Sequence, residues 1–196
     1  LLSSILWGGA DFLGGKLSKR YQAIAVTAVS QAIGLAIGIL IVLISSSWFR
    51  PTLSWDNYFL SGVCAGLLGF IGLVAFYSGL ATGRMGVVAP ISALSVIIPL
   101  TIAFINGEKP NTGQMIGMGI DLTGAFFASG PEVKGGLAIK PIVYAVIAAF
   151  GFGGAVTFIA KGSESSAIMT MTTMRFATFM VALLLFARYR TIGGFT

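Results

Sequence analysis

Residues 58–80 read YFLSGVCAGLLGFIGLVAFYSGL, a stretch of 23 residues without a charged side chain. A run of about 18 or more mostly apolar residues is long enough to cross the hydrocarbon core of a bilayer as a helix. Backbone polar groups inside lipid require a helix or a closed barrel, and barrel strands alternate polar and apolar residues. This stretch does not alternate, and it therefore predicts a transmembrane helix.

Two further apolar runs precede this one and four follow it, with short polar connections between them. The seven runs cover residues 1–15, 22–46, 58–80, 86–106, 113–129, 140–160 and 167–187. Of all residues 56% are hydrophobic and 9% are charged, whereas soluble domains have about 25% charged residues. We therefore predict an all-α, polytopic bundle of transmembrane helices in the cell (inner) membrane, and we exclude a soluble domain and a disordered chain.

The titratable residues exclude most catalytic chemistry. The chain has no histidine, and Cys64 is its only cysteine, which argues against a zinc site of the usual Cys/His type and against a catalytic constellation. We therefore expect no enzymatic activity, no metal and no cofactor. Twelve Lys and Arg against six Asp and Glu give a net charge of +6. The basic residues lie mostly in the connections, where they set topology and contact anionic lipid, so we expect membrane lipid and not nucleic acid as a partner.

An internal repeat is suggested by a shift of 145 positions, which aligns WGGA at 7–10 with FGGA at 152–155. In both segments a lysine follows after five further residues. The chain contains 27 glycines, so a chance match is the alternative. A true repeat makes residues 1–129 a first five-helix unit with its N-terminus cut. Residues 140–196 then begin a second, truncated unit that enters the membrane from the opposite side, and we expect about seven of ten helices to be present.

Six short motifs follow one another along the chain. They are WGGADF at 7–12, FYSGL at 76–80, VAP at 88–90, IPL at 98–100, NGEKP at 106–110 and QMIG at 114–117. Their order and spacing resemble the EamA family of the drug/metabolite transporter superfamily. The resemblance implies two inverted five-helix repeats around a central cavity, and a secondary transporter that exports or exchanges small metabolites or drugs by alternating access. The alternatives are a membrane-embedded channel and a structural or sensory membrane protein without transport.

Asp11 is the most informative polar residue, because it lies inside the first apolar run, about a helical turn or more from Lys16. A carboxylate at such depth usually marks a pathway. Trp7 precedes it by four residues and shares its helix face. Gly8 and Gly15 lie close to this stripe, where they would allow close approach of backbone or substrate. We hypothesise that Asp11 binds a cationic group or a coupling proton. The alternative is an interfacial acid paired with Lys16 or with a cation in a loop.

Arg175 lies near the middle of the last apolar run, and the repeat places Ser30, beside Gln31, at the equivalent depth. Two polar positions at similar depth suit a binding site near the membrane midplane. In this interpretation Arg175 pairs with Asp11 or with a carboxylate of the substrate. The alternatives are neutralisation by a structural carboxylate, or a side chain that extends to the interface.

The fourth run contains Pro90 and Pro99, which remove backbone hydrogen bonds and predict a kink or hinge. Ser92 and Ser95 lie on one stripe with Pro99, where they would line a cavity. The alternative is a kinked helix that only packs well. Tyr77, near the end of the third run, either contacts the substrate or is an interfacial tyrosine.

Three further features of the sequence bear on packing, on oligomeric state and on the orientation in the membrane. Asp121 lies in the middle of the fifth run, where it would pair with a cation or lie at an oligomer contact, and the oligomeric state stays unknown. The GxxxG pairs at 34/38, 62/66 and 113/117 predict close helix packing. Eight basic residues in the odd-numbered connections against three in the even-numbered ones place the N-terminus outside, whereas the resemblance places it inside.

Overall fold

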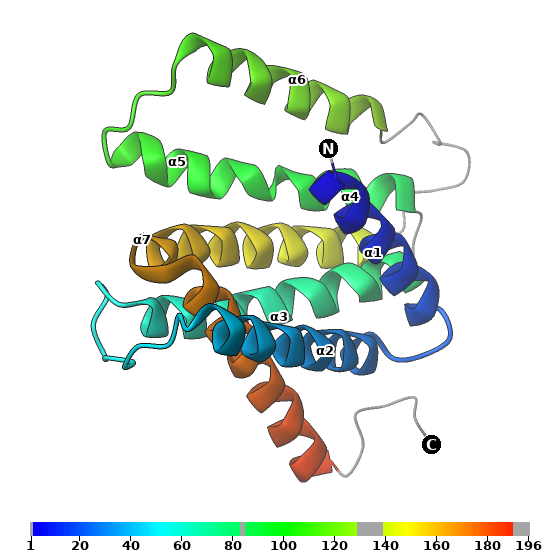
Figure 1. The fold of residues 1–196 in the computed structure, drawn as a ribbon. Coiled ribbons are helices and arrows are strands. Elements are labelled where there is room, and N and C mark those ends of the chain that lie inside the picture. Colours follow the sequence, from blue (N-terminus) through cyan, green and yellow to red (C-terminus); the bar gives the residue numbers. More distant parts are fainter. Residues whose placement is uncertain (1, 83–84, 129–138, 190–196) are drawn as a thin grey trace.

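The structure is a computed structural model that describes residues 2–82, 85–128 and 139–189. Every regular element in these residues is a helix, so the predicted all-α membrane bundle is confirmed. In chain order the elements are α1 (Leu2–Ser18), α2 (Ala23–Ser45), α3 (Tyr58–Thr82), α4 (Met85–Ala93), the 3-10 helix η1 (Leu94–Val96), α5 (Ile97–Ile105), α6 (Thr112–Ala128) and α7 (Ile139–Tyr189) (Figure 1).

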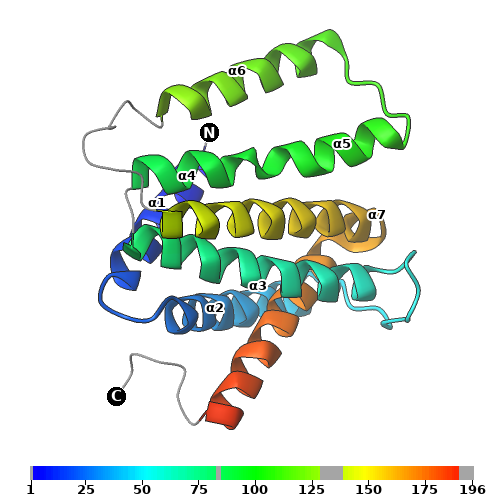
Figure 2. The same cartoon turned by 180° about the vertical axis from the view of Figure 1, so that it is seen from behind.

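Four segments of the described chain are long and apolar enough to cross a membrane. They are α2, α3, the run from α4 to α5, and α7, whereas α1 and α6 have only 17 residues each. The helix α3 lies at the centre and contacts α1, α2, α4 and α7. The helix α6 lies farthest from α3 and packs against α4 (Figures 1 and 2).

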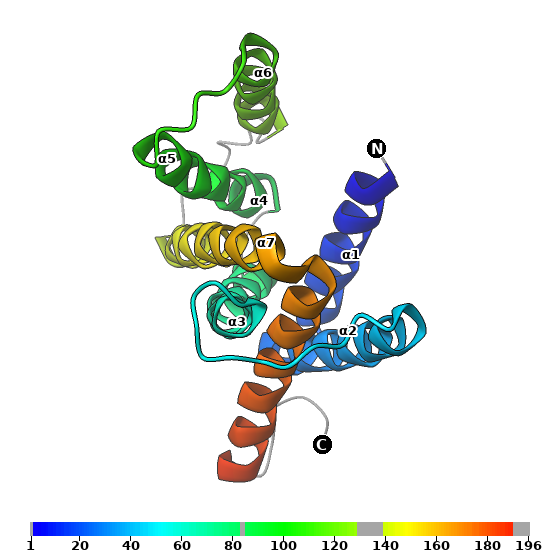
Figure 3. The same ribbon diagram turned by 60° about the vertical axis from the view of Figure 1, so that its left-hand side comes forward.

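The sixth and seventh apolar runs follow one another without a loop, as the two halves of α7. The 51 residues of this helix would extend about 75 Å at about 1.5 Å per residue, more than twice the thickness of the hydrocarbon core. The backbone leaves helical geometry at Ser166, with φ −164° and ψ 114°, and the second half then crosses α2 (Figure 3). This bend lies 145 positions after Tyr21, in the connection from α1 to α2. The order of helix, bend and helix thus recurs at the predicted shift, while the inverted repeat itself stays a prediction.

The fourth run, predicted for 86–106, is helical but interrupted, because the 3-10 helix η1 separates α4 from α5. Pro99 has no N–H group with which to bond the carbonyl of Ser95, as a continuous helix would require. Gly153 of α7 lies directly against this carbonyl, and a Cβ atom added to Gly153 would stand 2.7 Å from the oxygen of Ser95. The absent side chain therefore lets α7 approach the break in the fourth run.

Two of the three GxxxG pairs form the predicted close packing. The pairs 34/38 in α2 and 62/66 in α3 both meet residues 170–178 of α7, and Thr178 donates a hydrogen bond to the carbonyl of Gly66 at 3.1 Å. The third pair, 113/117 in α6, was wrongly expected to pack. A Cβ atom on Gly117 would meet nothing within 4 Å, because α6 is peripheral in the described part of the chain.

Candidate functional site

The carboxylate of Asp11 lies at the contact between α1 and α3. It is half-buried, and the side chain of Trp7, which lies one turn earlier on the same face, is close enough to interact with it. Tyr77 of α3 is 5% exposed and lies close enough to Asp11 for its hydroxyl to interact with the carboxylate charge. The structure therefore brings together three residues that the sequence analysis singled out, from two different helices.

Two glycines allow this close contact between α1 and α3. The ring of Tyr77 packs directly on Gly14, and a Cβ atom on Gly15 would stand 2.7 Å from Cδ1 of Leu80. Gly15 acts as expected, whereas a Cβ atom on Gly8 would meet nothing within 4 Å in the described residues, so the approach of a substrate at Gly8 stays a prediction. The sequence analysis missed Gly14, although its position one turn after Asp11 was an available signal.

The side chains around Asp11 suit recognition of a cation or a proton. A carboxylate accepts hydrogen bonds and attracts positive charge, the phenol of Tyr77 can donate or accept, and the indole of Trp7 offers an aromatic face to a cation. Trp7 is 69% exposed, so the group is open on that side and closed on the side of α3.

Arg175 and Gln31 form a second polar contact, where the second half of α7 crosses α2. The Nη1 atom of Arg175 donates a hydrogen bond to Oε1 of Gln31 at 3.0 Å, and the guanidinium lies over Gly34. The predicted pairing of Arg175 with Asp11 is absent in the structure, where each group has a different neighbour. Ser30 is exposed, and its hydroxyl donates to a carbonyl of its own helix at 2.9 Å.

The polar residues of the fourth run take part in helix packing. Ser92 is 3% exposed, and its hydroxyl donates to the carbonyl of Ala145 in α7 at 3.4 Å. Pro90 lies in α4 and Pro99 in α5, on either side of η1, and Ser95 belongs to η1 itself. This arrangement favours the interpretation of the run as a packed, interrupted helix, and its role in binding a substrate stays a prediction.

Asp121 belongs to α6, but its side chain lies outside the described residues. Within the described residues, no three His, Cys, Asp or Glu side chains come together as a metal site would require.

Comparison with known proteins gives one match. The sequence profile of the EamA-like transporter family matches residues 1–130 of the 196-residue chain, which is more than half of its length. The matched residues include α1 to α6 and therefore Asp11, Tyr77 and Gln31, whereas Arg175 lies outside the matched range. No curated protein and no solved structure matches the chain.

Proposed function

The chain belongs to the EamA-like transporter family, and we propose that it is a multi-pass secondary transporter that exports or exchanges small molecules by alternating access. The family consists of membrane transporters of the drug/metabolite type and not of enzymes. The proposal extends this assignment to a mechanism, to the cell (inner) membrane and to named residues.

The half-buried carboxylate of Asp11 carries the proposal. A charged side chain within the membrane costs several kcal/mol unless it faces water or a partner. In the described part of the chain no cation pairs with Asp11, whose neighbours are the indole of Trp7 and the phenol of Tyr77. A carboxylate kept at this depth without a structural cation is suited to a cation that comes and goes, either a basic group of the substrate or a coupling proton.

The other polar groups have separate roles in this mechanism. Tyr77 holds the α3 side of the site and hydrogen-bonds the substrate. Arg175 and Gln31 form a second polar position on α7 and α2, where they bind a hydrogen-bonding or anionic part of the substrate. The interruption at η1 and the bend at Ser166 are places where segments can rotate without breaking a continuous ladder of helix hydrogen bonds.

Transport in proteoliposomes tests the proposal, with a panel of radiolabelled amino acids and the fluorescent cation ethidium as probes. We expect saturable flux of at least one probe that follows its gradient or a proton gradient. The Asp11→Asn variant should insert normally but lose at least 90% of this flux. Asp56→Asn is the matched control, because Asp56 is an exposed carboxylate in the connection before α3. Flux that does not saturate would indicate a channel, and no flux with any probe would indicate a structural or sensory protein. Normal flux through Asp11→Asn would contradict the assigned role of Asp11.

A further inference from the structure

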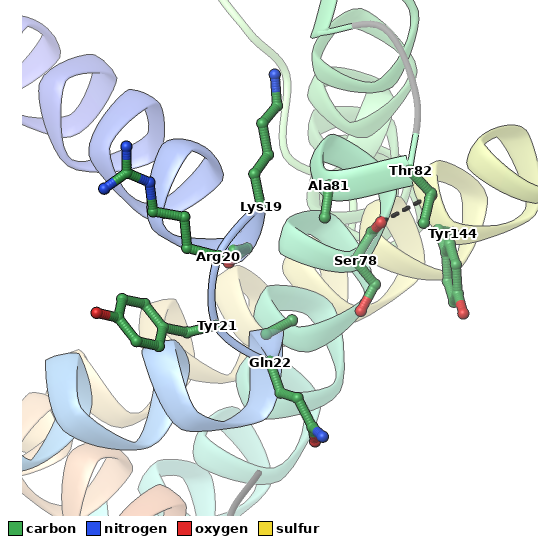
Figure 4. A pocket seen from close by; sticks show the side chains of 10 residues that line it. Lys19, Arg20, Tyr21, Gln22, Ser78, Ala81, Thr82 and Tyr144 are labelled. Carbon is green, nitrogen blue, oxygen red and sulfur yellow. Dashed lines mark hydrogen bonds between the residues drawn. The ribbon is translucent and has the colours of Figure 1, made fainter. Parts of the chain in front are cut away.

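A cavity of about 360 Å³ lies at the end of the bundle where α1 turns into α2 (Figure 4). Its lining consists of residues 18–23 together with side chains at the end of α3 and near the start of α7, among them Ser78, Thr82 and Tyr144. The volume falls within the range of about 300 to 1,000 Å³ that is common for small-ligand sites. Trp7, Asp11 and Tyr77 do not belong to the lining, so the cavity is separate from the site proposed for transport.

The charged side chains that line this cavity are both basic. Lys19 and Arg20 are exposed, and the lining contains no acidic residue. In Figure 4 their long side chains extend in different directions from the turn. The electrostatic character of the cavity therefore favours an anion over a cation.

The wall of the cavity also contains hydrogen-bond donors without acceptors in the described part of the chain. The hydroxyl of Ser18, a lining residue that is only 8% exposed, has no hydrogen-bond partner there. Gln22 precedes α2 as its N-cap but forms no side-chain cap hydrogen bond, and the first turn of α2 contains no acidic residue. Helix geometry leaves the first N–H groups of α2 without acceptors in the helix, at the positive end of the helix dipole. These donors, like the two cations, are suited to an oxyanion.

We propose that this cavity binds a phosphate group, supplied either by the headgroup of an anionic phospholipid or by a soluble phosphate. Helix N-termini together with Lys and Arg side chains are the usual protein partners of phosphate oxygens. The cavity lies where α1 ends and α2 begins, which is the level of the lipid headgroups if these helices cross the bilayer. Tyr21 and Tyr144 in its lining are of the aromatic type that is enriched at this level.

The first test measures thermal unfolding of the full chain with two probes. In an uncharged detergent, inorganic phosphate is added against chloride of equal ionic strength. In lipid nanodiscs, phosphatidylglycerol is compared with phosphatidylcholine alone. We expect at least one probe to raise the Tm by about 2 to 4 °C at saturation. Stabilisation by phosphatidylglycerol alone identifies a lipid site, and stabilisation by inorganic phosphate alone identifies a site for a soluble ligand. Stabilisation by both probes identifies a site that accepts phosphate from either source. Stabilisation by neither probe overturns the proposal.

Two double variants distinguish binding in this cavity from attraction of the anion by surface charge in general. The double change Lys19→Gln/Arg20→Gln should weaken the half-maximal effect of the active probe at least fivefold. Its matched control, Arg50→Gln/Lys109→Gln, removes two exposed cations from the connections at the opposite end of the bundle and should leave the effect unchanged (Figure 1). An equal loss in both double variants overturns the proposal, because it would show that any basic surface residue suffices.

The Gln22→Asp variant tests whether the N-terminus of α2 forms part of the site. An aspartate at the N-cap would accept hydrogen bonds from the free N–H groups of α2 and repel an anion. We expect this variant to have a higher Tm than the wild type without any probe, and to gain no further stability from the probe that stabilises the wild type. A higher Tm with an undiminished effect of that probe would overturn the assignment of the site to the N-terminus of α2.

Discussion

Arg175 and Gln31 are joined by a hydrogen bond of 3.0 Å, although 144 positions separate them in the sequence. The bond ties the second half of α7 to α2 at the point where Gly34 leaves room for the guanidinium. An arginine at membrane depth requires polar partners, and the amide oxygen of Gln31 provides one. Arg175 is therefore held in place by a neutral group, which leaves its charge available to a ligand.

Replacement of Gln31 by Leu should destabilise the protein by about 1 to 3 kcal/mol, because the half-buried guanidinium of Arg175 loses its acceptor. The double variant Gln31→Leu/Arg175→Leu should cost less than the sum of the two single changes. The free energies come from unfolding with SDS in mixed micelles, combined in a double-mutant cycle. Ser30→Ala is the control and should have little effect, because its hydroxyl bonds only its own helix. Single changes that add to within about 0.5 kcal/mol would contradict the coupling.

Gly14→Ala should disrupt the Asp11 site without altering any charge. A methyl group at this position would collide with the ring of Tyr77 and push α1 away from α3. We expect transport to fall at least tenfold in proteoliposomes, with normal insertion. Gly8→Ala is the control on the same helix, because its methyl group would meet nothing within 4 Å. Equal transport by the two variants would show that the spacing of α1 and α3 does not matter for function.

Gly151→Ala should destabilise the packing of α7 on α3 by about 1 to 3 kcal/mol. The added Cβ atom would stand 2.6 Å from Cα and 2.7 Å from the nitrogen of Gly72, and backbone cannot move aside as a flexible side chain can. Gly117→Ala in α6 should instead stabilise slightly, by up to about 1 kcal/mol, since alanine is the better helix former and the site is open. Thermal unfolding in micelles compares the two, and a loss of stability in Gly117→Ala would show that α6 packs more tightly than described.

Much of the helix pattern could be predicted from the sequence, because apolar runs and polar connections are local signals. Each predicted run corresponds to helical residues with ends that differ by a few positions. The two proline positions predicted a kink, and the backbone forms a 3-10 turn between them. One local detail was wrong. The expected connection before residue 167 is reduced to a bend at Ser166, since the chain can change direction there with one non-helical residue.

The tertiary contacts were less accessible to sequence reasoning. Periodicity placed Trp7 and Asp11 on one face, but nothing local identified Tyr77 as the residue on α3 that meets Asp11. The sequence analysis placed Gln31 at the same depth as Arg175 but expected Asp11 or a carboxylate of the substrate as the partner of Arg175, whereas Gln31 forms the bond. Which glycines pack depends on which helices are neighbours, and this explains why the pair 62/66 packs and the pair 113/117 does not.

Accessibility of position 11 to water most directly tests the claim that Asp11 lies on a transport pathway. Cys64 is the only cysteine, so a Cys64→Ser background allows a single new thiol at either of two positions. Asp11→Cys is compared with Ile33→Cys, whose native side chain is 59% exposed in the middle of α2 and would face lipid. A membrane-impermeant thiol reagent reacts with the thiolate, which forms in water and not in hydrocarbon. The account predicts modification of Asp11→Cys in proteoliposomes at least ten times faster than that of Ile33→Cys. Equally slow modification at both positions would contradict it.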